Sequence, residues 1–396
     1  MKITDIRFVE LEGVLEYEGE LWESRNSSPN LIYPEFRDGD FAGYTPRTPD
    51  GNYAISGVFV EVDTDVGVTG RSGPTWSGTA QLIAQYLRPR AVGEDALAHE
   101  RIWDRCYRST TPGRKSPVIE AMSMLDCALW DLKGKLLEQP VYKLLGGPTR
   151  ETVPAYASTT GCSLDPGRVR ERSQALVSDG YTAMKWFFLH GPGSGREGMA
   201  KNLELVRTVR EAVGDDVDIM FDAWLSWDVP YAVAVGERMA EYRPRWLEEP
   251  VSPDRIDSCA AIRRALPFPI ASGEHEYTRW GHQDLIRAEA VDVLQPDIYW
   301  VGGLTETLKI CTMASVTEPV VVPHVHSVSA TVHLLFSQPP DVCPFLEYLT
   351  RWNVVNQFFL KDPILPRNGE VGLPEGPGMS MELDEDKITS RRELDL

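Results

Sequence analysis

Three acidic residues recur at a constant interval in the second half of this chain. Asp222, Glu248 and Glu274 stand 26 residues apart, and each closes a short apolar run: DVDIMFDAW, PRWLEEP and FPIASGEH. The stretches between these runs have the apolar spacing of amphipathic helices. A repeated strand and helix with an acid at each strand end is typical of a parallel β/α barrel, in which functional residues gather at the carboxyl ends of the strands.

The same alternation of strand and helix continues beyond the three acids. Helical patterns such as KNLELVRTVREAVG and GLTETLKICTMA separate most of the strand candidates. Eight alternations over roughly two hundred residues favour an α/β fold with a TIM-type barrel. The predicted barrel strands are TVPAYAST, YTAMKWFF, DVDIMFDAW, PRWLEEP, FPIASGEH, VDVLQPDIYW, EPVVVPH and CPFLEYL.

The part of the chain before the barrel has a mixed α+β pattern. KITDIRFVEL alternates like a strand, and SGVFVEVDTDVGVTGRSG predicts a hairpin that turns near Asp65 to Gly67. Between them, residues 17–52 are polar and rich in aromatic residues, which predicts a long loop, and long loops in compact domains are often lids. Helical patterns follow in TAQLIAQYLRPRAV, DALAHERIWDRCYR and PVIEAMSMLDCALWDLKGKLLEQP.

Charge and cysteine usage narrow the range of partners and compartments. The formal net charge of −19 disfavours nucleic acid and acidic membranes as partners, although a metal and a few arginines could still attract an anionic substrate. The six cysteines are scattered without a C-x-x-C pair, which indicates buried, reduced thiols and a reducing cytoplasm. The first residues do not resemble a signal peptide, and no apolar run reaches membrane-spanning length.

The equally spaced acids are candidate metal ligands. A single acid at a strand end is more often a solvated loop residue or a helix N-cap, but three at equal spacing favour a metal site. Carboxylate oxygens on adjacent strands suit a hard cation, most plausibly Mg²⁺. Glu249 is the alternative to Glu248; the spacing favours Glu248, with Glu249 turned to the other face of the strand.

The next two strand ends supply a candidate general base. VLQPD ends at Asp297 and VVVPH ends at His324. An aspartate that accepts a hydrogen bond from a histidine ring fixes its tautomer and raises the basicity of the other ring nitrogen, which makes His324 the predicted base. His326 is its closest competitor and would share the face if the strand continued, but Pro323 favours an end of the ladder there.

Two further residues have less decisive contexts. His275 could contact the substrate or could hydrogen-bond within the barrel wall, and Glu347 could act on the reacting region or be a solvated strand-end acid. Taken together, the candidates suit removal of a proton α to a carboxylate. A hard cation can chelate that carboxylate and an adjacent hydroxyl and stabilise the enediolate, while the base sits beside the carbon.

These motifs, in their order, resemble the enolase superfamily in its mandelate racemase subgroup. The resemblance is carried by ALWDLKGK, FDAW, WLEEP, SGEH, QPD, VPH and the GLTE helix. It implies a modified (β/α)7β barrel, an α+β capping domain built from both termini, Mg²⁺ on Asp222, Glu248 and Glu274, and the His324–Asp297 dyad. The expected division is residues 1–148 for the cap, 149–361 for the barrel and 362–396 for a segment that packs back on the cap. Glu347 matches a glutamate that many relatives carry on the last strand.

The second barrel strand departs from the pattern of many members. They carry K-x-K, and the second lysine is a base on the opposite face of the substrate. In MKWFFLHGPG, Lys185 matches the first lysine, but Phe187 stands where the second would be. A two-base racemase is therefore disfavoured. A single base suits β-elimination, in which His324 could take the α-proton and return it to the departing hydroxyl.

Within the subgroup the chain looks most like acid-sugar dehydratases related to L-rhamnonate dehydratase. They share SGEH and a C-terminal run seen here as KDPILPRNGEVGLPEGPGMSMELD. Arg47 falls where those enzymes place an arginine that reaches the substrate carboxylate, although an exposed loop arginine is equally possible. Lys185 would sit near the metal-bound carboxylate, and YPEFRD would help set substrate choice. We expect a Mg²⁺-dependent aldonate dehydratase, a homo-oligomer acting on a small carboxylate; the alternative is a one-base epimerase or cycloisomerase.

Overall fold

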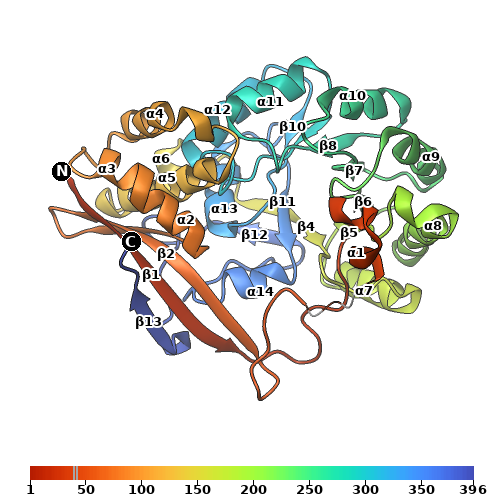
Figure 1. The fold of residues 1–396 in the computed structure, drawn as a ribbon, viewed down its shortest axis with the longest axis horizontal. Coiled ribbons are helices and arrows are strands. Elements are labelled where there is room, and N and C mark those ends of the chain that lie inside the picture. The colour runs from red at the N-terminus through yellow and green to blue at the C-terminus, as the bar shows by residue number, and fades with distance from the viewer. Residues whose placement is uncertain (39–40, 42) are drawn as a thin grey trace.

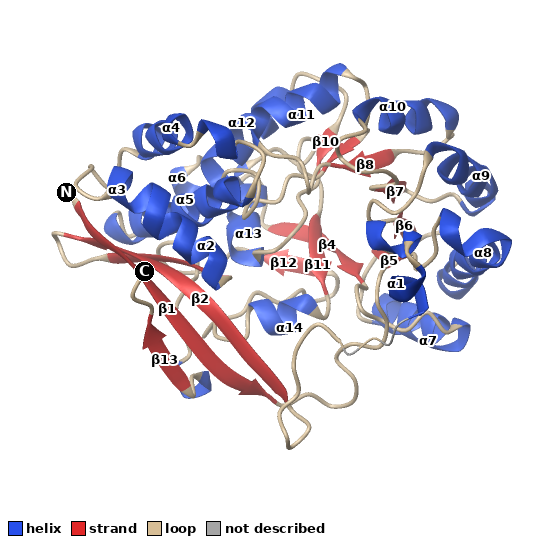
Figure 2. Cartoon of the chain, viewed as in Figure 1, coloured by secondary structure: helices blue, strands red, loops and turns tan. Residues whose placement is uncertain are grey.

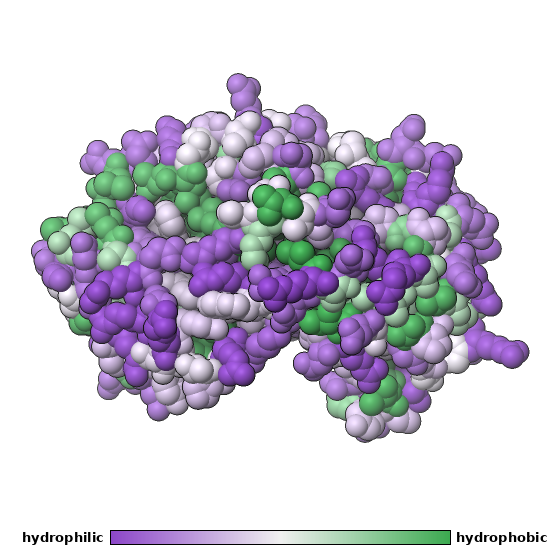
Figure 3. Space-filling view, turned by 90° about the horizontal axis from the view of Figure 1, so that it is seen from above, coloured by the Kyte–Doolittle hydropathy of each residue, from purple (hydrophilic) through white to green (hydrophobic). Residues whose placement is uncertain are grey.

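The chain forms a curled parallel sheet surrounded by helices, with a separate antiparallel sheet at one side (Figure 1). The structure is a computed structural model that describes residues 1–38, 41 and 43–396. Within these residues, no helix is long and apolar enough to cross a membrane. The face seen in Figure 3 is mostly hydrophilic with apolar patches between the polar side chains.

The predicted eight-stranded barrel is confirmed. Its parallel strands are ordered β10-β9-β8-β7-β6-β5-β4-β11, and β12 (Glu370–Gly372) pairs antiparallel with β4. Seven helices connect the eight strands, which gives the (β/α)7β arrangement. The strands are β4 (Thr152–Ser158), β5 (Ala183–Phe187), β6 (Asp218–Asp222), β7 (Trp246–Glu248), β8 (Ile270–Ser272), β9 (Val293–Leu294), β10 (Val320–Val321) and β11 (Leu346–Leu349). The helices are α7 (Pro166–Ser178), α8 (Gly195–Val213), α9 (Val229–Met239), α10 (Ile256–Ala265), α11 (Thr278–Arg287), α12 (Leu304–Ala314) and α13 (Val328–Ser337).

An apolar layer fills the interior of the barrel directly below the candidate site. Successive side chains on a strand point to opposite faces, so residues two apart share the interior face. Two positions after members of this layer lie Lys185, Asp222, Glu248, Gln295 and His324. The polar side chains therefore form the next layer towards the carboxyl ends of the strands. The apolar layer consists of Tyr156, Ala183, Met220, Trp246, Ala271, Val293 and Val322, all of them buried.

The antiparallel sheet and its helices form the part of the chain before the barrel. The sheet is ordered β13-β1-β2-β3, so the C-terminal strand pairs with the N-terminal one. The predicted hairpin is confirmed as β2 and β3, and its turn includes Gly67 at φ +78°. The expected division at residues 148 and 361 stays a prediction. The elements are β1 (Ile3–Leu15), β2 (Tyr53–Thr64), β3 (Thr69–Thr75), β13 (Ser390–Glu393), α2 (Ser77–Leu82), α3 (Arg88–Ala91), α4 (His99–Ser109), α5 (Pro117–Leu136) and α6 (Val141–Leu144).

Helix α5 joins the two parts (Figure 2). Its proline at the first turn and the Ser116 N-cap, whose hydroxyl accepts from the Val118 N–H, start the helix. Buried Asp126 accepts hydrogen bonds from the Thr305 backbone N–H (2.9 Å) and hydroxyl (2.6 Å) at the start of α12. On the other side, a Cβ at Gly70 would lie 2.2 Å from the Ala128 carbonyl oxygen, so β3 approaches α5 as closely as glycine permits.

In its described residues, the polar, aromatic-rich stretch is irregular, as predicted, apart from a short 3₁₀ turn (Pro29–Ile32) and α1 (Pro34–Asp38). It runs from the antiparallel sheet to the barrel mouth. The Ser27 N–H donates to the Phe188 carbonyl (2.7 Å), and the Ser27 hydroxyl donates to the Ala223 carbonyl (2.7 Å). The six cysteines are buried and unpaired, as expected. The remaining helix, α14 (Trp352–Asn356), follows β11.

Candidate active site

The three equally spaced acids meet at the carboxyl ends of adjacent strands. Asp222 ends β6 and Glu248 ends β7, where the two are register partners, and Glu274 follows β8. One oxygen from each carboxylate lies within 4.8 Å of the others. All three side chains are buried, with at most 3% exposure. The arrangement gives three hard oxygen ligands around one point.

The electrostatics of this cluster favour a cation. Burial and the neighbouring Glu248 raise the pKa of Asp222 well above its ordinary value, against the effect of Lys185. Burial also raises the pKa of Glu274 to about 7, although His324 opposes this shift. Three carboxylates in one water-poor space repel one another, and a divalent cation would relieve that repulsion. The residues therefore fit Mg²⁺, which prefers carboxylate oxygens.

Lys185 lies fully buried beneath the acids. Its ammonium group is 3.4 Å from an Asp222 oxygen and 2.9 Å from a Glu347 oxygen, and it also pairs with Glu248. Burial lowers the pKa of Lys185, but Glu248 and Glu347 outweigh it, so the pKa is raised and the group is charged. Glu347, on β11, is fully buried and holds this lysine; it does not line the cavity.

Hydrogen bonds fix the orientation of Glu248. Its Oε2 accepts from Trp246 Nε1 (2.9 Å) and from Gln295 Nε2 (2.7 Å), while Oε1 faces Lys185. A carboxylate has about four acceptor positions, so these bonds leave room for a metal. Gln295 was not predicted from the sequence, although it lies two residues after an inward-facing apolar residue, as Glu248 does.

Asp297 and His324 form the predicted pair. His324 Nδ1 donates to Asp297 Oδ2 at 2.7 Å, and the backbone N–H groups of Tyr299 (2.7 Å) and His326 (3.0 Å) also donate to Asp297. Burial would raise the pKa of Asp297, but the hydrogen bonds from the two histidines hold it well below its usual range. The charged carboxylate keeps the proton on Nδ1, which leaves His324 Nε2 free to act as a base. That nitrogen lies 3.8 Å from Glu274 Oε2.

Glu249 and His275 form a second pair beside the acids. Glu249 has φ +40° and is buried, and its carboxylate accepts from His275 Nδ1 at 2.9 Å. Burial lowers the pKa of His275, but the Glu249 charge raises it to about 9. His275 Nδ1 is also 3.5 Å from Glu274, so this group could hold a cation as well. In this structure, however, the Glu249 carboxylate is hydrogen-bonded to the His275 imidazole and does not join Asp222 and Glu248.

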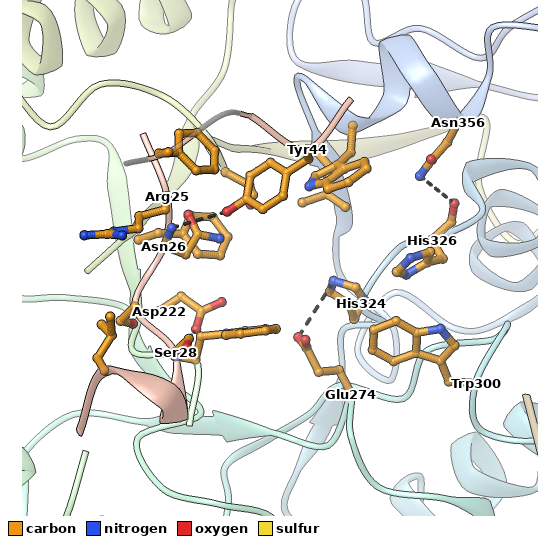
Figure 4. A pocket seen from close by; sticks show the side chains of 18 of the residues that line it. Arg25, Asn26, Ser28, Tyr44, Asp222, Glu274, Trp300, His324, His326 and Asn356 are labelled. Carbon is orange, nitrogen blue, oxygen red and sulfur yellow. Dashed lines mark hydrogen bonds and ion pairs between the residues drawn. The ribbon is translucent and has the colours of Figure 1, made fainter. Parts of the chain in front are cut away.

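A cavity of about 360 Å³ opens at the barrel mouth (Figure 4). Asp222 and Glu274 lie at its floor, with His324 and His326 on one wall, and Phe187 also lines it. The irregular N-terminal stretch forms the outer wall. Its contributions include Arg25, Asn26, Ser28, Leu31, Phe36 and Tyr44.

Arg47 lies outside this set of lining residues. Its guanidinium pairs with Glu20 and donates to the Gly51 carbonyl (2.6 Å) and the Tyr53 hydroxyl (2.7 Å), and 40% of its side chain is exposed. Among the described residues that line the cavity, Arg25 is the one lysine or arginine. Its guanidinium donates to the carbonyl of Arg37.

Sequence reasoning missed several lining residues. Trp300 contacts three imidazoles, with ring centroids 5.4 Å from His275, 5.4 Å from His324 and 4.5 Å from His326. Its position three residues after QPD, in the loop that follows a functional strand end, could have marked it as a lining residue. Arg25 had none, because only the folded path of the N-terminal stretch brings it to the barrel.

Most of the chain is similar in sequence to known proteins. Residues 168–387 match the family described as Enolase C-terminal domain-like, and residues 53–146 match the Mandelate racemase / muconate lactonizing enzyme, N-terminal domain. The L-rhamnonate dehydratase of Saccharopolyspora erythraea is 35% identical over 380 residues, which cover 93% of this chain and 92% of that protein.

Solved structures show the same similarity over almost the whole chain. Rhamnonate dehydratase from Gibberella zeae complexed with Mg is 29% identical, with a TM-score of 0.84 over 98% of this chain and 95% of that one. The 3,6-anhydro-D-galactonate cycloisomerase from Zobellia galactanivorans is 28% identical, with a TM-score of 0.77 over 98% of each chain. Mg²⁺ is the cofactor of this protein. The chain belongs to the enolase superfamily, in its mandelate racemase subgroup.

Proposed function

We propose that this enzyme, a dehydratase (hydro-lyase) like its relatives, removes the β-hydroxyl of an acid sugar and yields a 2-keto-3-deoxy acid. The observation that carries the proposal is the asymmetry of the cavity. His324, oriented by Asp297, stands on one wall, and Phe187 lines the cavity at the position where two-base relatives would carry a second lysine. One base can remove the α-proton, but an apolar ring cannot return a proton to the opposite face.

The proposed metal ligands are Asp222, Glu248 and Glu274. When bound, Mg²⁺ supplies positive charge that stabilises the enediolate formed from the substrate carboxylate. Lys185 and its partner Glu347 hold the ligand carboxylates in place and limit their negative charge. His275 keeps Glu249 out of the ligand set. These roles leave the metal site rigid, which preorganises it for the developing charge.

His324 removes the α-proton. Its Nδ1 proton is held by Asp297, and its Nε2 lies beside Glu274, at the edge of the proposed metal site. Arg25 is positioned to contact an anionic or hydroxyl group of the substrate. We also keep Arg47 as a proposed carboxylate ligand, which requires its ion pair with Glu20 to open and the side chain to swing towards the cavity.

A cycloisomerase is the second candidate, because the relative from Zobellia galactanivorans is named for that reaction. Both reactions can begin with one base and one enediolate. The test is to incubate the protein and Mg²⁺ with a library of acid sugars, L-rhamnonate included, and to detect 2-keto acids with semicarbazide. We expect time-dependent keto-acid formation from at least one aldonate. Substrate consumption without any keto acid would instead support isomerisation, and would refute dehydration.

A further inference from the structure

We propose that His326 donates the proton that leaves with the β-hydroxyl, in place of a proton returned by His324. The inference rests on the dehydration proposed above and adds a catalytic residue to it. His326 and His324 both line the cavity, and their rings lie on the same wall (Figure 4). The strand ends before Pro323, as predicted, and both rings nevertheless reach the cavity.

One carboxylate serves both imidazoles. Asp297 Oδ2 is 2.7 Å from His324 Nδ1, 3.0 Å from the His326 backbone nitrogen and 3.4 Å from His326 Nδ1. The Nδ1 atom of His326 is buried and lies near the limit of hydrogen-bonding distance from this oxygen. The inner nitrogens of both rings thus face the same carboxylate oxygen, which leaves the outer nitrogens directed away from Asp297.

The ring of His326 is held firmly without losing its access to the cavity. Its centroid is 4.5 Å from that of Trp300, and its backbone carbonyl accepts from Asn356 Nδ2 at 3.3 Å. Its side chain is 33% exposed, compared with 11% for His324. The Trp300 ring and the fixed backbone limit the rotation of the His326 ring. A proton donor needs such a fixed orientation because it must reach one defined substrate atom.

The two rings are neighbours on the cavity wall. His324 Nε2 lies 3.8 Å from the carboxylate of Glu274, one of the residues that would hold the metal. The His326 ring centroid is 5.6 Å further along the wall. A substrate that presents C2 to His324 would therefore extend its next carbons, and the hydroxyl on C3, towards His326.

The proposed elimination transfers one proton to His324 and takes one proton from His326. His324 takes the proton from C2, and the electrons of the C2–H bond form the C2=C3 bond. The C3–O bond breaks, and the hydroxyl takes a proton from His326 and departs as water. The enol then gains a proton at C3 and loses one from its C2 hydroxyl, giving the 2-keto-3-deoxy acid. His324 has gained one proton and His326 has lost one, and exchange with solvent restores both rings.

The test compares His326→Gln with wild type on L-rhamnonate, or on the acid sugar that the library identifies, in D₂O. Hydroxide is a poor leaving group, and a general acid contributes about 10²–10⁴-fold. We expect His326→Gln to lose about that factor in keto-acid formation while it still exchanges the α-proton for deuterium. A 3-deoxy-3-fluoro analogue should restore the variant, because fluoride leaves without a proton; its release should stay within about tenfold of wild type.

Controls separate chemistry from folding. His190→Gln changes a half-buried histidine away from the cavity lining and should behave as wild type. Thermal melting and Mg²⁺ binding of His326→Gln should also match wild type. Equal losses of exchange, water elimination and fluoride release, or unchanged dehydration, would overturn the role of His326. If wild type dehydrates no acid sugar, the proposed function fails, and this inference fails with it.

Discussion

Replacing Asp297 by asparagine tests how the dyad is tuned. The amide has nearly the same shape as the carboxylate. In the wild type, Oδ2 accepts from His324 Nδ1 and from the His326 backbone N–H, and Oδ1 accepts from the Tyr299 N–H. If the amide oxygen keeps the Tyr299 bond, the amide nitrogen donates to His324 Nδ1. The imidazole must then carry its proton on Nε2, and the base is lost.

The expected loss can be estimated from this change of tautomer. The same substitution in a Ser-His-Asp site costs about 10⁴ in turnover, and each tenfold is about 1.4 kcal/mol of activation free energy. We therefore expect kcat to fall about 10³–10⁴-fold, about 4–5.5 kcal/mol, with the fold intact. The assay is keto-acid formation under saturating substrate and Mg²⁺, together with circular dichroism. A variant that retains more than about a tenth of wild-type kcat would refute this reasoning.

Two further predictions follow from buried groups. Glu248→Gln should weaken Mg²⁺ binding, measured calorimetrically, much more than Glu249→Gln, because Glu249 is engaged by His275 in a separate pair; equal effects would remove Glu248 from the ligand set. Burial lowers the pKa of His333 to about 3, from an ordinary value of 6.5, and the Tyr142 N–H donates to its Nδ1. Below pH 6.5, His333 is therefore protonated in the unfolded chain but stays neutral in the native state. The free energy of unfolding consequently falls as the pH drops from 6.5 towards 3. The loss from His333 should be about 2 kcal/mol by pH 5. Urea titrations should show a shallower pH dependence in His333→Gln, and an unchanged slope would contradict the assignment.

The barrel and its metal half were predictable from sequence because they depend on local periodicity. An apolar run fixes a strand, the strand fixes which side chains face inward, and parallel strands bring their last residues to one end. Asp222, Glu248, Asp297 and His324 all follow this rule. Glu274 lies one residue beyond the inward-facing position, and it was predicted from its spacing and from the apolar run that it closes.

The outer half of the cavity was not predictable in the same way. Arg25 reaches the site because Ser27 ties an irregular stretch to the ends of two barrel strands, and no periodic pattern encodes that path. Arg47 was selected by resemblance, yet in the structure its guanidinium pairs with Glu20. The burial of Lys185 depends on three carboxylates from three strands, which only the curled sheet brings together.

The central claim is that a single base, His324, begins a dehydration in this site. The most direct measurement follows α-proton exchange and keto-acid formation by His324→Asn in D₂O, with Mg²⁺ binding measured in parallel. We expect both reactions to fall to background while the metal still binds, because Phe187 offers no substitute base on the cavity wall. Near-normal exchange or turnover in His324→Asn would contradict it.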